Sequence, residues 1–432
     1  MKLQTTSDYS MKSFSLIWSG QAISLFGSAI VQFALIWWLT QKTGSATILA
    51  MASLVGLLPP VLLGPFAGVL VDRMSRRLTL ILADGLVALA TIVLAYLFWL
   101  DVIAVWHVFV LLFVRALGGA FHYPAFQAST ALMVPEKHLT RIQGMNQILE
   151  GSLSVVSAPL GAVLLGVLPM QGVLAIDVIT AVFAILPLLF LAIPQPKRQA
   201  ETSAETATFR TDLREGFRYV WAWPGLMIMM LLAMLVNLML TPSTSLQPLL
   251  ITEHFGGGAL QLSFLEASFG IGIIVGGVGL SVWGGFKRRI VTTIVGLIGL
   301  GVSFLFIGLA PANAFWMAVT GAFFAGGMIA LTNGPVRAIL QSVIAPEMQG
   351  RVMSLIISLS SAMSPIGLII AGPAADLLGI RTWYVFAGVV ASVVGIVGFF
   401  LPPLMNVENG RLSSSVPLQV ESEFLGVDSA ST

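Results

Sequence analysis

Charged side chains inside long apolar segments are the residues of this chain whose chemistry can be predicted first. Arg115, Glu150 and Asp84 each lie within a segment long enough to cross a bilayer. Burying such a group in hydrocarbon is costly, so its presence indicates ion binding, proton transfer or charge pairing. Arg115 and Glu150 lie roughly 15 Å and 12 Å from opposite ends of consecutive antiparallel helices, so their side chains could meet. We predict a proton-coupling pair, with Asp84 as the alternative carrier and a purely structural pair as the other interpretation.

Four other charged residues lie near the ends of apolar segments. Asp177 and Glu266 are expected at the start of their helices and Asp376 at the end of its helix, all near one membrane face. An acid in such a position can simply cap a helix, which is the structural interpretation of all three. Arg337 is expected to extend toward the opposite interface.

The composition defines the class of protein that contains these charges. Hydrophobic residues make up 57% of the 432 residues and charged residues 9%, with a mean hydropathy of +0.95. A soluble chain has roughly 25% charged residues, so this is an integral membrane protein. The chain has no cysteine, which excludes disulfides and thiolate chemistry. It has no phosphate-binding glycine loop, acyl-transfer motif or clustered histidines, so we predict no enzyme activity, no cofactor, no metal and no nucleic-acid partner.

Apolar segments of spanning length recur twelve times, so we predict an all-α polytopic protein with twelve transmembrane helices. Lys and Arg concentrate in alternate loops, which predicts that both termini are cytoplasmic. The expected spans are Phe14–Thr40, Thr47–Val71, Leu78–Trp99, Val105–Phe126, Ile142–Leu164, Leu174–Ile193, Leu226–Leu250, Leu262–Phe286, Ile290–Leu309, Phe315–Ile339, Val352–Leu377 and Trp383–Leu404.

The two halves of the chain share sequence patterns. Val134-Pro135-Glu136 is echoed by Ala345-Pro346-Glu347, and the small residues around Pro159 by those around Pro365. This predicts two parallel six-helix repeats with a substrate site between them. The expected divisions are an N-terminal bundle (1–193), a cytoplasmic linker (194–225), a C-terminal bundle (226–404) and a disordered cytoplasmic tail (405–432).

The linker contains one amphipathic segment. From Phe209 to Trp221, apolar residues share one helical face beside an arginine stripe formed by Arg210, Arg214 and Arg218. This pattern predicts a helix on the cytoplasmic leaflet that contacts anionic membrane lipids, with docking of a protein partner as the alternative.

A charged turn separates the second and third apolar segments. Its pattern, Gly-x-Leu-x-Asp-Arg-x-x-Arg-Arg, resembles the signature loop of the major facilitator superfamily of secondary transporters, with Ser75 where that family usually has glycine. The resemblance implies a conformational latch in which Asp72 meets the start of the eleventh span, near Gly350. Arg115-Ala116-Leu117-Gly118-Gly119 resembles the family's second motif, an arginine associated with proton coupling. The latch residues are Gly68, Asp72, Arg73, Arg76 and Arg77.

The fifth predicted span, Ile142–Leu164, carries a stretch of small residues. This stretch partly matches the small-residue seam along which the corresponding helix of the superfamily's proton antiporters packs against its neighbours. Ala158, Pro159 and Gly161 lie in that seam, although alanine replaces the first glycine of the family pattern. The resemblance implies exchange of a drug for protons.

Motifs along nearly the whole chain resemble the bacterial macrolide-efflux family, among them Trp18-Ser19-Gly20-Gln21 and Ala120-Phe121-His122-Tyr123-Pro124. The resemblance implies an exporter of macrolide-like or other lipophilic antibiotics in the inner membrane, and we expect it to act as a monomer. The first alternative is a lipid or lysophospholipid translocator of the same fold, and the second is a non-transporting receptor or scaffold. From their depth, the expected substrate-binding residues are Gln32, Trp37, Tyr123, Phe126, Asn237 and Asn333, with core packing as the alternative.

Overall fold

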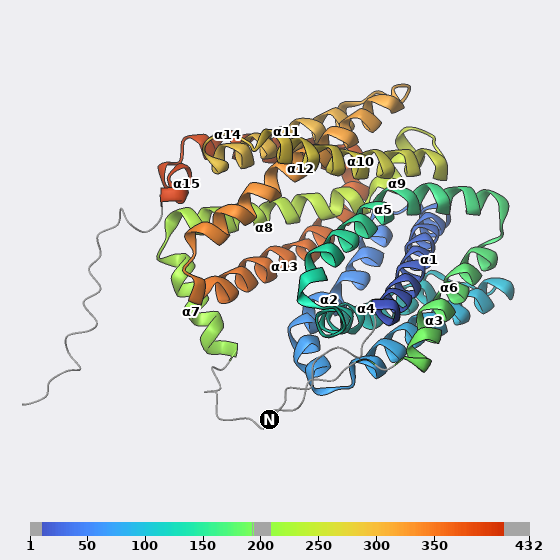
Figure 1. Ribbon diagram of the computed structural model, residues 1–432. Coiled ribbons are helices and arrows are strands. Elements are labelled where there is room, and N and C mark those ends of the chain that lie inside the picture. The colour runs from blue at the N-terminus through green and yellow to red at the C-terminus, as the bar shows by residue number, and fades with distance from the viewer. Residues whose placement is uncertain (1–10, 192, 194–208, 410–432) are drawn as a thin grey trace, which may run out of the picture.

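The computed structural model describes residues 11–191, 193 and 209–409, and every regular element in these residues is helical (Figure 1). Twelve of the described helices are long and apolar enough to cross a membrane, which confirms the predicted fold class. They are α1 (Met11–Thr43), α2 (Ala46–Arg73), α3 (Arg76–Trp99), α4 (Val105–Met133), α5 (Glu136–Val167), α6 (Met170–Phe190), α8 (Pro224–Ser245), α10 (Ala259–Trp283), α11 (Arg289–Leu309), α12 (Phe315–Val343), α13 (Pro346–Leu378) and α14 (Ile380–Phe399).

Serine residues begin two of these helices. Ser45 caps α2 by accepting a hydrogen bond from the Ile48 amide, and Ser75 caps α3 through the Leu78 amide. A serine oxygen replaces part of the hydrogen bonding that the first turn of a helix lacks. Ser75, which departs from the usual glycine of the charged turn, therefore has a local role as an N-cap.

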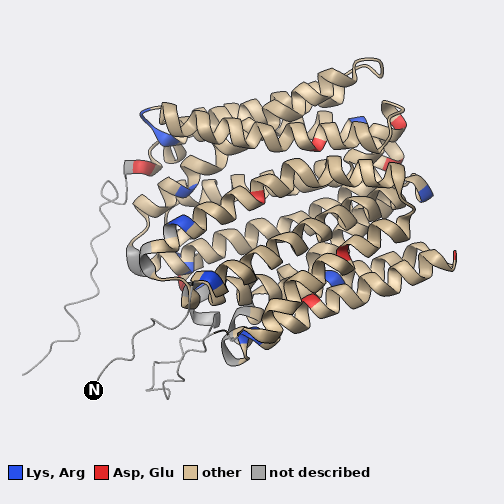
Figure 2. Cartoon of the chain, turned by 45° about the vertical axis from the view of Figure 1, so that its right-hand side comes forward, with Lys and Arg blue, Asp and Glu red and all other residues tan. Residues whose placement is uncertain are grey.

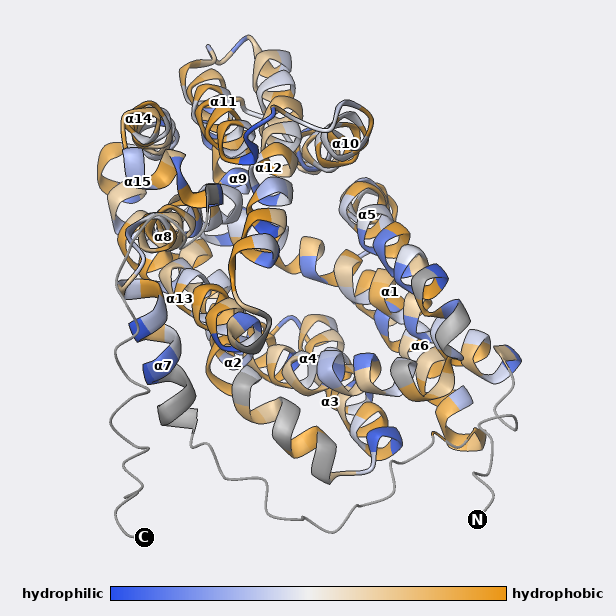
Figure 3. Cartoon of the chain, turned by 60° about the vertical axis from the view of Figure 1, so that its left-hand side comes forward, coloured by the Kyte–Doolittle hydropathy of each residue, from blue (hydrophilic) through white to orange (hydrophobic). Residues whose placement is uncertain are grey.

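The spanning helices contact one another mainly within two groups, α1–α6 and α8–α14 (Figure 3). Across the boundary between the groups, α2 packs against α13 and α5 against α10. Small residues permit the second contact, because a Cβ added at Gly270 would lie 3.1 Å from the Ser154 carbonyl oxygen.

The two ends of the molecule differ in how the groups meet. At the terminal end, where α1 begins and α14 ends, one apolar cluster contains only residues up to Ile193 and another only residues from Val220 onward. At the opposite end a single cluster spans both groups and includes Leu35 of α1 and Ala375 of α13. The short elements α9 (Gln247–Leu249) and η1 (Leu250–His254) fill this cluster with fully buried leucines. The described groups are therefore sealed together at the opposite end only.

The structure describes part of the linker and part of the tail. Helix α7 (Phe209–Trp221) forms where the amphipathic pattern predicts it and packs against α13, to which Glu215 is bound by an ion pair with Arg351. Arg214 and Arg218 are exposed, so contact with lipid headgroups stays a prediction. The side chain of Arg210 and residues 194–208 lie outside the described part.

The predicted start of the disordered tail at residue 405 is corrected by the structure. Helix α15 (Pro402–Met405) and the turn η2 (Val407–Asn409) continue the fold, with Leu404 and Val407 fully buried. Glu408 accepts a hydrogen bond of 2.7 Å from the Ile290 amide at the start of α11. Apolar anchors and this cap hold the segment in place, while residues 410–432 lie outside the described part.

Candidate functional site: a central cavity with two charge networks

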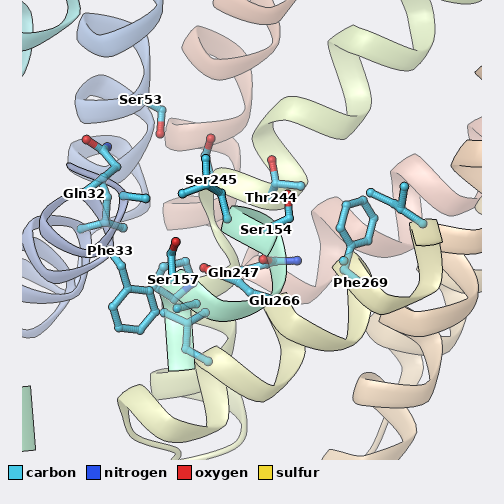
Figure 4. Close-up of a pocket in the computed structure, with 18 residues that line it drawn as sticks. Gln32, Phe33, Ser53, Ser154, Ser157, Thr244, Ser245, Gln247, Glu266 and Phe269 are labelled. Atoms are coloured by element: carbon cyan, nitrogen blue, oxygen red, sulfur yellow. The ribbon is translucent and has the colours of Figure 1, made fainter. Parts of the chain in front are cut away.

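Two adjoining chambers form a central cavity between the helix groups. The Asp84 chamber, of about 620 Å³, is lined mainly by α1–α4 and includes Gln21, Asp84, Arg115 and His122. The Glu266 chamber, of about 440 Å³, lies among α1, α5, α8 and α10 (Figure 4). The chambers lie next to each other, because Ala29, Gln32, Ser53, Leu153 and Ser245 line both.

A buried ion pair joins α4 to α6 beside the Asp84 chamber. Arg115 Nη1 lies 2.5 Å from Asp177 Oδ2, and the two side chains are 8% and 1% exposed. Ser28 Oγ and Thr91 Oγ1 each donate a hydrogen bond of 2.8 Å to the Asp177 carboxylate, and Arg115 also donates to Thr91. The network therefore connects α1, α3, α4 and α6, and each carboxylate oxygen of Asp177 is satisfied.

This arrangement corrects the predicted pairing of Arg115 with Glu150. Glu150 is exposed on α5, while Arg115 faces the interior of its own helix group. The direction in which each side chain leaves its helix, which depth along the helix does not specify, decided the partner. Asp177 is also not the helix cap that its position suggested, because α6 begins at Met170, two turns earlier.

A second network surrounds Asp84 on α3. Gln21 Nε2 donates a hydrogen bond of 2.8 Å to Asp84 Oδ2, which turns the amide oxygen of Gln21 toward His122. His122 Nε2 lies 2.7 Å from that oxygen and 3.3 Å from Asp84 Oδ1. Because both oxygens accept, Nε2 carries the hydrogen and donates it. Asp84 and His122 are thus two titratable groups that share one buried network on the cavity wall.

The opposite end is held by a carboxylate that crosses between the groups. Asp376 near the end of α13 accepts hydrogen bonds from the backbone amides of Ala46 (2.7 Å) and Thr47 (3.0 Å) at the start of α2. The Ser45 and Thr47 hydroxyls donate to the same carboxylate, at 3.1 and 2.6 Å. A negative charge at a helix N-terminus is stabilising. Asp376 therefore caps a helix, as the sequence suggested, but that helix is α2 of the other helix group.

Asp376→Asn is expected to weaken this closure, because an amide loses the charge and leaves some of the four donors unsatisfied. The carboxylate is exposed, so the loss is on the order of 1–2 kcal/mol, or about 5–30-fold in the population of the closed end. Cysteines introduced on the facing surfaces of α2 and α13 should crosslink more slowly in the variant, and the absence of native cysteine removes background. Asp101→Asn, on the exposed α3–α4 loop, is the matched control. Equal crosslinking in all three proteins would contradict a closing role for Asp376.

The charged turn is only partly described. The side chains of Gly68, Asp72 and Arg73 lie outside the described residues, so the proposed contact of Asp72 with α13 stays a prediction. Arg76 is buried. Arg77 donates to the carbonyl oxygens of Leu188 and Leu189, both at 2.5 Å, and so anchors α3 to the last turn of α6 within its own helix group.

The seam residues of α5 pack toward α1. Ala158 is buried and lines the Glu266 chamber. A Cβ added at Gly161 would lie 2.9 Å from the Phe33 ring, so glycine permits the close approach of these helices. Pro159 lies inside α5, which remains helical around it.

Among the six predicted substrate-binding residues, Gln32 lines both described chambers. Trp37 packs against the apolar cluster of the opposite end, and Phe126 stacks on His122 with ring centroids 6.0 Å apart. Tyr123 is exposed and accepts from Gln127 of its own helix, and Asn237 donates to the Ala233 carbonyl. Asn333 is exposed on α12. Depth alone did not select the residues that face the cavity.

The structure also places two residues in the cavity that the sequence analysis did not assign there. His122 was part of a matched motif without a role, and Glu266 was interpreted as a helix cap. Helix α10 begins at Ala259, so Glu266 lies two turns inside it. An acid two turns inside a spanning helix is the signal that would have identified both Glu266 and Asp177.

A polytopic bundle with a cavity between two helix groups, lined by apolar side chains and a few polar and charged ones and sealed at one end, has the architecture of an alternating-access membrane transporter. The family model of the Major Facilitator Superfamily matches residues 17–367 and 230–422. The chain belongs to this superfamily, and it is a transporter rather than an enzyme.

Two groups of curated proteins are similar to most of the chain. It is 36% identical to macrolide efflux protein A of Streptococcus pyogenes, over 89% of this chain and 94% of that protein. Macrolide efflux protein A of Enterococcus faecalis is 35% identical, over 75% of this chain and all of that protein. The multidrug efflux pump Tap of Mycolicibacterium fortuitum is 27% identical over 88% of this chain and 94% of the pump.

Solved structures share the fold at low sequence identity. A POT family transporter in complex with 5-aminolevulinic acid matches with a TM-score of 0.69 and 13% identity, covering 91% of this chain and 96% of that one. A bacterial homologue of the iron transporter ferroportin in the inward-facing state matches with a TM-score of 0.67 and 14% identity, covering 89% and 98%. At such identities the likeness concerns the fold alone.

Proposed function

We propose that this protein exports macrolide-like or other lipophilic antibiotics across the bacterial cytoplasmic membrane in exchange for protons. The observation that carries the proposal is the 36% identity, over 89% of the chain, to a protein named for macrolide efflux. The cavity supports it, because Phe33, Phe269 and Leu153 supply apolar walls while Gln32 and Gln247 supply neutral polar groups. Such walls suit a bulky amphipathic molecule.

Charge distribution supports an orientation with both termini in the cytoplasm. Lys and Arg gather at the terminal end of the bundle, as Figure 2 illustrates, and loops rich in these residues remain on the cytoplasmic side. The terminal end is also where the two helix groups have separate apolar clusters. In this orientation the described conformation accepts drug from the cytoplasm or inner leaflet, and rocking of the groups opens the end that Asp376 closes.

The proton path is proposed to run through Asp84 and His122. Both line the cavity and both can change protonation while keeping a hydrogen-bond partner in Gln21. Arg115 is proposed to supply the counter-charge of Asp177 and to fix the packing of α1, α3, α4 and α6 around this site. Glu150 loses its place as the favoured carrier, because the pairing on which that role depended is absent from this structure.

Both chambers lie among the helices of a single chain, and we propose that a monomer is sufficient for transport. Protons and a lipophilic drug are the proposed solutes, and the exposed arginines of α7 are the proposed contact with anionic lipids.

Expression in a drug-sensitive bacterium tests the proposal directly. Cells that produce the protein are expected to accumulate less radiolabelled 14- or 15-membered macrolide than control cells, and a protonophore should abolish the difference. A protonophore-insensitive difference would leave export standing but contradict proton coupling. Unchanged macrolide levels together with altered labelling of leaflet phospholipids would instead indicate the lipid translocator. Absence of any flux in proteoliposomes would favour the non-transporting scaffold.

A further inference from the structure

One carboxylate of the central cavity is unlike the others. Glu266 is the only ionisable residue among the eighteen that line the Glu266 chamber, counted in the described part of the chain. Its side chain extends from α10 into the chamber, whose other lining groups are apolar side chains, hydroxyls and the amides of Gln32 and Gln247 (Figure 4). Its position one turn before Gly270 places it beside the contact between α10 and α5.

Glu266 also differs in its partners. Asp177 is paired with Arg115, and Asp84 is bound by Gln21 and His122, but no described residue forms a hydrogen bond or ion pair with the Glu266 carboxylate. A carboxylate held at membrane depth needs a counter-charge or a proton to offset the loss of water. The described residues supply bonded partners to the other two carboxylates and none to Glu266, so a proton or a cationic ligand that enters through the cavity has to offset its charge.

The surroundings of Glu266 limit the chemistry of that partner. A divalent metal prefers several oxygen ligands with more than one carboxylate, whereas a single carboxylate beside amide and hydroxyl oxygens suits an ammonium group. The nearby Phe33, Phe269, Leu153 and Ile273 require an apolar body attached to that group. In a site of low dielectric, attraction between the two charges is stronger than in water.

We propose that Glu266 binds the protonated amine of a lipophilic substrate and so makes this exporter selective for lipophilic amines over neutral molecules of the same shape. The inference rests on the proposed drug export and adds to it the chemical feature by which the substrate is recognised. Binding the amine neutralises the carboxylate, while the apolar walls hold the rest of the molecule.

A pair of ligands that differ in one group tests this inference. Erythromycin carries a dimethylamino sugar that is protonated near neutral pH, and its derivative with the dimethylamino group replaced by hydrogen is neutral. Equilibrium binding of both radiolabelled compounds is measured on the purified full chain, and their transport in energised everted vesicles. Glu266→Gln is expected to weaken erythromycin binding at least about tenfold and to change binding of the neutral derivative less than about threefold.

Two further variants test whether the effect depends on the charge at position 266. Glu266→Asp keeps the charge and should recover most of the selectivity for erythromycin. Asp101→Asn makes the same chemical change on an exposed loop whose left-handed residue (φ 57°) asparagine tolerates, and should bind both compounds like the parent.

Each of the remaining outcomes decides whether Glu266 recognises the amine. If Glu266→Gln binds both compounds like the parent, or loses both equally, recognition of the amine by Glu266 is excluded, and equal loss assigns the residue to the fold or to gating. Parent vesicles that transport neither compound would contradict the proposed export, while the binding ratio on purified protein would still decide the role of Glu266.

Discussion

Arg115→Ala is expected to abolish active drug export and to produce the largest loss of stability among single substitutions in the cavity wall. It leaves the Asp177 carboxylate, 1% exposed, without its counter-charge. Breaking a buried ion pair from one side costs about 3–5 kcal/mol, because the remaining charge stays buried and unpaired. Export is measured in energised vesicles, and stability as the melting temperature of the purified protein.

A double variant separates the stability of the pair from its function. Arg115→Ala with Asp177→Asn removes both charges and should recover most of the lost melting temperature. If the pair takes part in transport, this folded protein still fails to export. Recovery of export in the double variant would show that the pair is only structural. Arg337→Ala, which removes an exposed arginine from α12, is the matched control and should resemble the parent.

Asp84→Asn is expected to disconnect transport from the pH gradient while drug binding remains. Asparagine has nearly the same shape and can still bond to Gln21, but it cannot take up and release a proton. In proteoliposomes, drug accumulation should no longer rise when a pH gradient is imposed, whereas exchange of labelled for unlabelled drug should continue. Accumulation that still follows the gradient would move the carrier to another residue.

Two comparison variants show which residue carries the proton. His122→Gln removes the second titratable group of the network and is expected to shift the pH at which the gradient is effective without eliminating the response. Glu150→Gln neutralises an exposed acid outside both networks and should leave the response unchanged. A lost response in Glu150→Gln together with a normal one in Asp84→Asn would restore Glu150 as the carrier.

The number and type of elements could be predicted because the membrane imposes them. A spanning helix needs about 20 apolar residues, and each of the twelve helices supplies them, so the count did not depend on tertiary contacts. The ends were less predictable. Helix α13 begins at Pro346 rather than Val352, because polar residues of its first turns extend it beyond the apolar segment. Helices α6 and α10 also begin earlier than expected, at Met170 and Ala259, so Asp177 and Glu266 lie two turns inside them rather than at their starts.

The candidate site was predictable in content and only partly in arrangement. Arg115 and Asp84 were identified because charge at membrane depth is rare, and both line the cavity. The partner of Arg115 could not be identified from the sequence. The depth of a residue in the membrane follows from counting residues at about 1.5 Å each, whereas its partner depends on the rotation and packing of each helix. Trp37 packs against the apolar cluster that joins the two groups, and Asn237 bonds to Ala233 of its own helix, so neither side chain lines the two chambers.

The sequence by itself determined that this chain crosses a membrane twelve times, is built from two related halves and carries charges that apolar surroundings make costly. These properties depend on composition and spacing, which act locally along each helix. Only the tertiary structure decided that Arg115 meets Asp177, that Asp376 crosses to α2 and that Glu266 faces the cavity without a protein partner. Such pairings join residues far apart in the chain, and their energies depend on distances of a few ångströms that no single helix specifies.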